Sequence, residues 1–167
     1  MSNFSFINEQ VCHHSAIENI NAEAFGPGRH TLAAARIRER GPHELQHSFV
    51  CMSGLEVVGS VRMTPIFVGK SPCYLLGPLA VLPAYKNNGI GRELVKVAVK
   101  SVAETGALAV LLVGDEPYYG ALDFKKAEAK ISFPGPVDPA RILVKMFRDE
   151  QLEAVLGKVE FRDSVLV

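Results

Sequence analysis

The segment of residues 79–94, LAVLPAYKNNGIGREL, constrains the fold of this chain more than any other. An apolar run ends at Pro83, a polar turn follows, and Gly89 and Gly91 lead into a helical pattern. Because glycine has no side chain, backbone N–H groups at such a turn can surround an anion. The first turn of a helix also leaves N–H groups without helical acceptors and carries a partial positive charge. The segment therefore predicts a strand–turn–helix unit that binds phosphate.

Length and charge limit the kinds of partner that this site serves. The 167 residues suggest a single domain, residues 1–167, with an ordinary globular composition. Eighteen basic and eighteen acidic residues balance to a net charge of zero. This balance argues against general electrostatic binding to nucleic acid or to an anionic membrane, so the anion site must be local. Every apolar run is much shorter than the ~20 residues that span a bilayer.

The cysteines and histidines do not predict a metal site. Cys12, Cys51 and Cys73 are far apart in the sequence, and His13-His14 is a solitary pair without zinc-ligand spacing. We therefore expect no metal. In the absence of a recognisable secretory signal, the cysteines suggest free thiols and a cytoplasmic location.

Hydrophobic periodicity and turn residues predict the elements that precede the central segment. Arg36, Arg38 and Arg40 in the second of the expected helices read as a solvated basic face. The expected elements are an edge strand at 4–7, a helix at 14–25, a helix capped by Thr31 and ending near residue 40, and three antiparallel strands at 48–52, 57–68 and 74–82.

The elements after the central turn are equally distinct. An amphipathic helix from residue 90 ends before Gly106, and a continuous apolar strand follows at 109–113. This strand–helix–strand order implies a right-handed crossover and a parallel pairing of residues 79–82 with 109–113. A short helix at 118–122 and a strand at 142–147 complete the prediction.

Two motifs together resemble a known family. Residues 81–94 resemble motif A of the GNAT superfamily of acyl-CoA-dependent N-acetyltransferases, in which a Gly-x-Gly turn opens the helix after the fourth strand. Residues 118–124, YYGALDF, are similar to the family's Phe/Tyr-Tyr-x-x-x-Gly-Phe segment after the fifth strand. The pair in this order is much more specific than either motif alone. The sequences LGPLAV and GDEPYY further resemble the YhbS-like bacterial branch.

The resemblance covers about residues 48–147 and implies an α/β fold of mixed type. Its sheet is expected to have six to seven mainly antiparallel strands, with a splayed parallel pair in the centre and flanking helices. Two residues depart from the family pattern. Lys86 replaces Arg or Gln and so lacks a planar guanidinium, whereas Asp123 replaces a Gly but tolerates a left-handed backbone.

The family implies acetyl-CoA as co-substrate and direct transfer of its acetyl group to an amine in a ternary complex. The pyrophosphate is expected on backbone N–H groups of residues 87–92, and the pantetheine arm between residues 79–81 and 112–114. The expected cofactor-binding residues are Leu79, Ala80, Val81, Lys86, Asn87, Asn88, Gly89, Ile90, Gly91, Arg92 and Tyr119.

Three residues match catalytic positions. The resemblance assigns Tyr119 as the acid that protonates the departing thiolate, and the backbone N–H of Leu79 as the donor that polarises the thioester carbonyl. Asp115 is the candidate for attracting the amine or accepting its proton. The structural alternatives are ring packing for Tyr119 and helix capping for Asp115. Weaker acceptor-site candidates are Glu23, Arg29 and His30.

Other functions fit less well. A non-catalytic acyl-CoA-binding sensor or scaffold of the same fold remains the alternative. The motif of P-loop hydrolases is absent, and Leu94 stands where a Rossmann dehydrogenase requires its third Gly. The acceptor amine is not encoded in a recognisable motif. Homodimerisation is common among such folds, and the C-terminal strands offer a surface for it.

Overall fold

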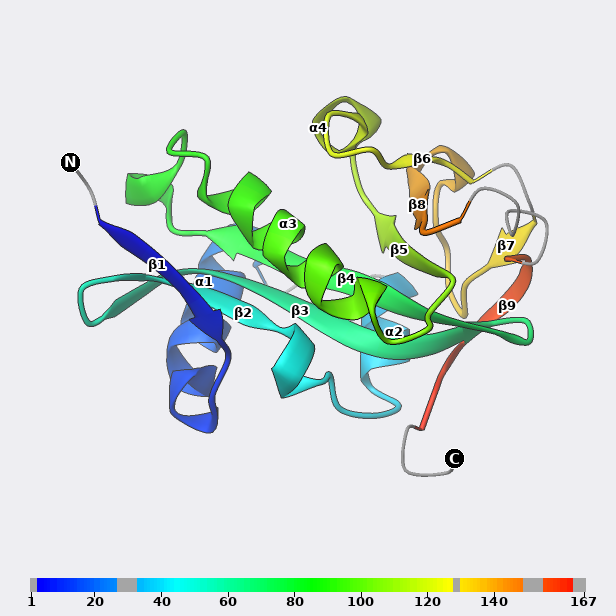
Figure 1. Ribbon diagram of the computed structural model, residues 1–167, viewed down its shortest axis with the longest axis horizontal. Helices are drawn as coiled ribbons and strands as arrows, with labels where there is room; N and C mark the ends of the chain where they lie inside the picture. The colour runs from blue at the N-terminus through cyan, green and yellow to red at the C-terminus, as the bar shows by residue number, and fades with distance from the viewer. Residues whose placement is uncertain (1–2, 27–32, 128–129, 149–154, 164–167) are drawn as a thin grey trace.

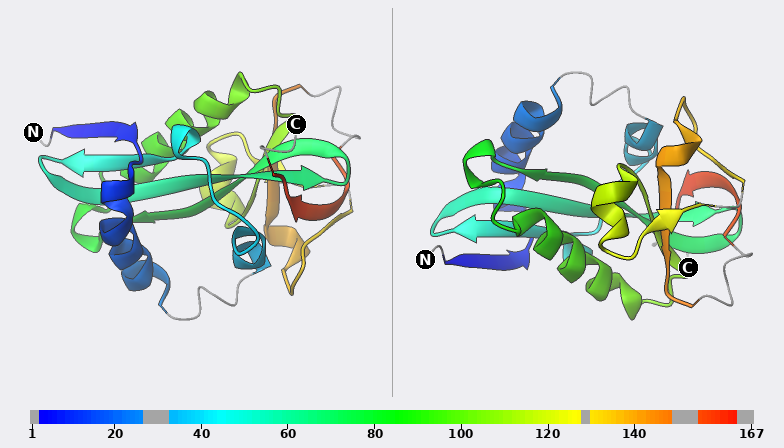
Figure 2. Two further views of the ribbon diagram at one scale, coloured as in Figure 1. Left: turned by 90° about the horizontal axis from the view of Figure 1, so that it is seen from below. Right: turned by 90° about the horizontal axis from the view of Figure 1, so that it is seen from above.

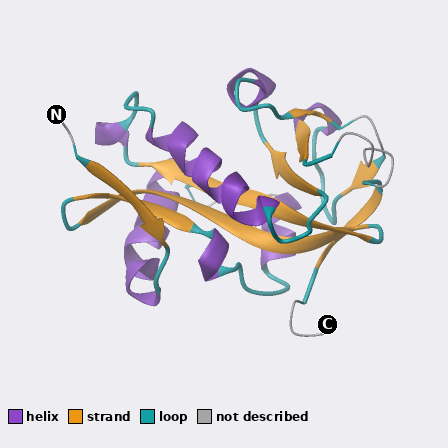
Figure 3. Ribbon diagram, viewed as in Figure 1, coloured by secondary structure: helices purple, strands orange, loops and turns teal. Residues whose placement is uncertain are grey.

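The computed structural model describes residues 3–26, 33–127, 130–148 and 155–163, and a long twisted sheet forms its centre (Figures 1 and 3). The strands follow the order β1-β2-β3-β4-β5-β8-β6, and β9 pairs with both β3 and β7. The strands are β1 Phe4–Asn8, β2 Phe49–Ser53, β3 Glu56–Val68, β4 Ser71–Val81, β5 Ala109–Val113, β6 Lys125–Lys126, β7 Ile131–Ser132, β8 Ile142–Met146 and β9 Gly157–Phe161.

The mixed α/β architecture with a mainly antiparallel sheet is confirmed. Among the described strands, only the β4–β5 and β7–β9 pairs are parallel. The nine strands exceed the six to seven expected. The prediction missed β6 and β7 because strands of two residues are too short to show an alternating pattern. It also missed β9, because the pattern of the last twenty residues is ambiguous.

Helices cover both faces of the sheet (Figure 2). Helix α3, Ile90–Ala103, lies on one face, and α1, His14–Phe25, and α2, Ala33–Arg38, lie on the other. The short helix α4, Glu116–Gly120, follows β5. Ile90, Leu94, Ala98 and Val102 of α3 are buried in the largest hydrophobic cluster, as their spacing predicts. None of the described helices is long and apolar enough to cross a membrane.

The β2–β3 hairpin and the strand 109–113 lie where the sequence predicts them. The parallel pairing of β4 with β5 occurs at other residues than predicted. Residues 79–82 do not pair with β5. Instead, Tyr74 is aligned with Val110 and Leu75 with Leu111. The sequence could not fix this register, because β4 is buried on both faces and its apolar run allows several alignments. The short helix α4 begins two residues earlier than expected, and the proposed cap Thr31 lies outside the described residues.

Candidate active site

Strands β4 and β5 form a fork. They are aligned at only two positions, after which Leu76–Val81 of β4 and Leu112–Val113 of β5 continue without pairing to each other. On its far side β5 pairs along its whole length with β8, and Gly114 N donates to Arg141 O at 2.9 Å. The gap therefore has one backbone edge from each strand. The family resemblance predicts the pantetheine arm in this gap.

The ladder between β3 and β4 fixes which N–H groups face this gap. The N–H of Leu82 donates to Val58 O at 2.8 Å, so Val58 and Leu82 form a hydrogen-bonded pair. Antiparallel pairs alternate between hydrogen-bonded and non-hydrogen-bonded types. Leu79 and Val81, aligned with Val61 and Gly59, are therefore of the second type, and their N–H groups point away from β3 into the fork. The intervening Ala80 is buried and turns its backbone toward β3.

A cavity of about 1020 Å³ opens at the fork. Leu79, Asp115 and Tyr119 line it together, although they come from different elements. Other walls come from α1, α2, β3 and the loop after α2, and include Glu18, Arg38, Arg62 and His43 respectively. Of the weaker acceptor-site candidates, Glu23 is exposed and does not line this cavity, whereas Arg29 and His30 lie outside the described residues.

The turn between β4 and α3 has the geometry of an anion site. Asn87 and Gly89 adopt left-handed φ angles of 66° and 76°. The Asn88 side chain donates to the carbonyl oxygens of Tyr85 and Lys86, at 2.9 and 3.2 Å, and holds the turn in shape. The first hydrogen bond within α3 runs from Glu93 N to Gly89 O. The N–H groups before Glu93 in the first turn therefore have no acceptor in the helix.

Four more residues belong to this turn: Lys86, Ile90, Gly91 and Arg92. The Lys86 side chain is exposed, whereas Ile90 is buried against the sheet. Gly91 lies beneath Tyr118, because a methyl group added at Gly91 would be 2.6 Å from the Tyr118 hydroxyl oxygen. The guanidinium of Arg92 lies 5.9 Å from the centre of the same ring. Tyr118 therefore joins α4 to the glycine turn, a contact that the sequence did not predict.

Tyr119 is held rigidly beside the fork. Its ring covers Gly114, where an added methyl group would lie 2.5 Å from Cε2, and it makes an edge contact with Phe124 at 5.9 Å. Burial, with smaller contributions from Tyr118 and Asp115, raises the pKa of Tyr119 to about 12. Among the described residues, no hydrogen-bond partner occupies its hydroxyl group. The phenol therefore stays protonated at neutral pH, and Tyr119 is one of the residues that line the cavity.

Asp115 and Asp123 flank this helix. Asp115 occupies the N-cap position of α4, but its side chain makes no capping hydrogen bond. It is 78% exposed and lies 3.5 Å from Arg141. Asp123 has a φ angle of 68°, which confirms that the substitution of Gly preserves a left-handed turn.

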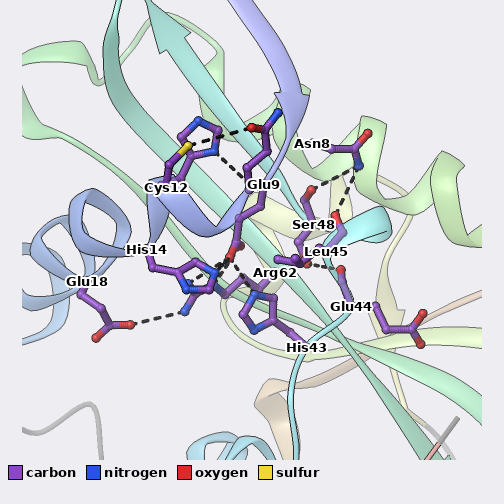
Figure 4. Close-up of polar contacts among 12 residues, drawn as sticks. Asn8, Glu9, Cys12, His14, Glu18, His43, Glu44, Leu45, Ser48 and Arg62 are labelled. Atoms are coloured by element: carbon purple, nitrogen blue, oxygen red, sulfur yellow. Dashed lines mark hydrogen bonds and ion pairs between the residues drawn. The ribbon is translucent and has the colours of Figure 1, made fainter. Parts of the chain in front are cut away.

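A cluster of acidic, arginine and histidine side chains forms another part of the site, and no sequence motif predicted it (Figure 4). The Glu9 carboxylate is buried and accepts hydrogen bonds from Arg62 Nε at 3.0 Å and from His43 Nε2 at 2.8 Å. His14 Nε2 is 2.9 Å from the same carboxylate. Burial opposes ionisation of Glu9, but the hydrogen bonds from His43 and Arg62 outweigh it and lower the pKa to about 2.

This cluster has the donor atoms of a metal site but not its charge balance. Ligand atoms of Glu9, His14 and His43 all lie within 4.8 Å of one another. The guanidinium of Arg62 already binds both carboxylate oxygens, so a divalent cation would compete with a fixed positive charge. The residues fit an ion-paired network that anchors Arg62 better than they fit a metal centre.

Arg38 corrects the expectation of a solvated basic face on α2. Arg36 and Arg40 are exposed, but the Arg38 side chain turns inward and its Nε is buried without a hydrogen-bond partner. Burial and the neighbouring Arg62 lower the pKa of Arg38 to about 10. Helix α2 has only six residues, too few for the sequence to show which arginine faces inward.

Sequence comparisons identify a family and several relatives of this chain. The sequence profile of the acetyltransferase (GNAT) family matches residues 14–126. The chain is 30% identical over 113 residues to the uncharacterized N-acetyltransferase YhbS of Escherichia coli K12, and the match covers 65% of the chain and 66% of that relative. The uncharacterized N-acetyltransferase YjhQ of the same strain is 26% identical over 126 residues, covering 73% and 70% of the two chains.

Solved structures share the fold. The crystal structure of YhbS from Escherichia coli in complex with CoA has a TM-score of 0.81 at 24% identity, covering 100% of this chain and 94% of that one. A GNAT family acetyltransferase from Brucella melitensis, in complex with acetyl-CoA, has a TM-score of 0.72 at 22% identity, with 99% of each chain covered. With the profile matching more than half of its residues, this chain belongs to the acetyltransferase (GNAT) family.

Proposed function

We propose that this protein is a single-domain, acyl-CoA-dependent N-acetyltransferase that moves the acetyl group of acetyl-CoA directly to an amine. One observation carries the proposal: the N–H of Leu79 points into a fork whose cavity also contains the protonated phenol of Tyr119. Acetyl transfer needs a hydrogen-bond donor for the oxyanion and a proton for the leaving thiolate. Leu79 and Tyr119, which line the same cavity, would supply the donor and the proton respectively.

The chain's own residues fit acetyl-CoA. The first turn of α3 offers unpaired N–H groups to the pyrophosphate, and the approach to Gly89 is open because nothing lies within 4 Å of an added Cβ atom there. The unpaired edges of β4 and β5 match the amide groups of a pantetheine arm, which has the hydrogen-bonding pattern of an extended chain. The CoA and acetyl-CoA complexes of the two structural neighbours support this assignment.

In the proposed reaction, the neutral amine attacks the thioester carbonyl and forms a C–N bond. The Leu79 N–H stabilises the negative charge that develops on the carbonyl oxygen. The C–S bond then breaks, and Tyr119 donates its proton to the thiolate, after which it is reprotonated from solvent. The proton that the amine loses passes through water to Asp115, which lies at the open end of β5. No covalent enzyme intermediate is needed.

The test is binding followed by turnover. Calorimetry with acetyl-CoA is expected to give micromolar affinity, and free CoA thiol should then appear with at least one member of an amine panel. Tight binding without turnover of any amine would favour the non-catalytic acyl-CoA-binding alternative. Absence of binding to acetyl-CoA and to longer acyl-CoA esters would contradict both functions.

A further inference from the structure

Arg38, for which the described residues supply no counterion, lines the cavity at the fork. Arg38 forms no ion pair with any residue in the described part of the chain, and its buried Nε donates no hydrogen bond. A buried charge without a partner is costly, so an unpaired guanidinium that lines a cavity is a candidate for binding an anionic ligand. The residue lines the same cavity as Leu79 and Tyr119.

The nearby Arg62 shows the contrast. Its three nitrogens are occupied: Nε and Nη2 bind the Glu9 carboxylate at 3.0 and 3.2 Å, and Nη1 lies 3.4 Å from Glu18. The charge of Arg62 is thereby compensated within the protein. Among the described residues none pairs with the charge of Arg38, so its guanidinium is available to an anion that enters the cavity.

Gly77 makes room for the guanidinium close to the reacting position. A methyl group added at Gly77 would lie 2.7 Å from Arg38 Nη2 and 4.0 Å from Leu79 N. Arg38 Nη2 and Leu79 N are therefore no farther apart than the sum of these two distances. Gly77 also has a φ angle of 129°, which L side chains rarely adopt. Arg38 thus stands beside the donor that is proposed to hold the thioester carbonyl.

We infer that Arg38 binds a carboxylate of the acceptor, an inference that rests on the proposed function. The acceptor is then an amino acid or a similarly short amine that bears a carboxylate. The planar fork of arginine matches a carboxylate with two parallel hydrogen bonds. The short separation between Arg38 and Leu79 requires the carboxylate and the attacking nitrogen to be only a few bonds apart. The exposed Asp115 lines the same cavity and suits the ammonium end of such a zwitterion.

Matched pairs of acceptors test this assignment. We would compare kcat/KM for several L-amino acids with that for their carboxamides, which differ only in the charged group. The carboxamides carry more neutral amine at pH 7.5, so basicity alone would favour them. The free acids are nevertheless expected to be preferred by about 100-fold, the discrimination typical of a charge-assisted, bidentate contact.

Variants of Arg38 connect the preference to this residue. Arg38→Gln should lower kcat/KM for the acids by about 100-fold, mainly through KM, and leave the carboxamides nearly unchanged. Arg38→Lys, which keeps the charge, should restore part of the preference. Arg36→Gln, on the exposed side of the same helix, is the control and should alter neither substrate class. Equal losses for acids and carboxamides with Arg38→Gln would overturn the inference.

Thermal unfolding gives a readout that does not depend on turnover. Arg38→Met removes an unpaired charge, so Tm should rise by at least about 2 °C, whereas loss of a structural contact would lower it. A lower Tm would contradict the ligand role. Acetyl-CoA binding with turnover confined to amines without a carboxylate would overturn the carboxylate site alone. Acetyl-CoA binding with no turnover of any amine would overturn the catalytic function on which that site rests. Absence of acyl-CoA binding would overturn the proposed function too, so its failure and that of the carboxylate site are distinguishable.

Discussion

The Tyr118 hydroxyl oxygen lies 2.6 Å from the point that the Cβ atom of an alanine at position 91 would occupy. Gly91→Ala should therefore displace Tyr118 and disturb the turn that is proposed to hold pyrophosphate. We expect acetyl-CoA affinity to fall by about tenfold, equivalent to about 1.4 kcal/mol. Calorimetry would measure this change.

A second variant separates this clash from other effects of the added methyl group. The ring carbon that bears the hydroxyl is 3.8 Å from the same point, an ordinary contact distance. In a Tyr118→Phe background, Gly91→Ala should thus cost much less affinity. A penalty of the same size in both backgrounds would show that Tyr118 is not the obstruction.

Tyr119→Phe keeps the ring that packs on Gly114 and Phe124 but removes the proposed acid. We expect kcat to fall by about 100-fold or more between pH 7 and 9, with little change in acetyl-CoA affinity. Because its pKa is raised to about 12, wild-type Tyr119 should remain an effective acid across this range. Tyr118→Phe is the matched control. Unaltered turnover by the Tyr119 variant would rule out the acid role.

Asp115→Asn tests the amine side of the cavity. The carboxylate makes no capping bond, so the substitution should leave unfolding almost unchanged while lowering kcat/KM for the amine by about tenfold or more. Glu116→Gln provides the control, because Glu116 is exposed, pairs only weakly with Lys126 and does not line the cavity. Equal effects of the two variants would indicate general surface electrostatics rather than a role for Asp115.

The buried Glu9 carboxylate should make stability depend on acid pH. Its pKa is about 2 in the folded protein and 4.5 ordinarily, so the unfolded chain takes up the proton first as the pH falls. The contribution is therefore complete above pH 4.5 and is lost progressively toward pH 2, an upper value of about 3 kcal/mol. Urea unfolding between pH 7 and pH 3 would measure it.

Two variants check this assignment. Glu9→Gln should lose this component of the pH dependence and unfold more easily at pH 7, by about 3 kcal/mol, because Arg62 is left without its main partner. Glu18→Gln removes a partner that is 56% exposed and should cost less than about 1 kcal/mol. A Glu9→Gln variant with wild-type acid sensitivity would locate the effect elsewhere.

Local signals were sufficient for most of the fold and for one wall of the site. The helix at 14–25 and the strand at 109–113 appear with their predicted bounds because their apolar residues repeat at the helical spacing or form an unbroken run. The glycine turn was also predictable, since the residues that shape it are adjacent in the sequence. A family resemblance then connected it with Tyr119.

The acceptor side could not be predicted in this way. Glu9 and Arg62 are 53 residues apart, and neither belongs to a spaced motif. Arg38 resembles its exposed neighbours in sequence, and only the packing of α2 beside Gly77 turns it inward. Such contacts depend on how elements meet across the sheet. Periodicity within one element therefore carries no information about them.

The fork between β4 and β5 has a consequence for the stability of the folded protein. The two central strands pair at only two positions, so backbone groups beyond that point have no partner on the neighbouring strand. Under the proposed function, acetyl-CoA supplies those partners. The co-substrate is then a structural component as well as a reactant. At a concentration 100 times its dissociation constant it would add about 2.7 kcal/mol to the stability of the native state. The abundance of acetyl-CoA in the cell would thus help to set how much of this protein remains folded.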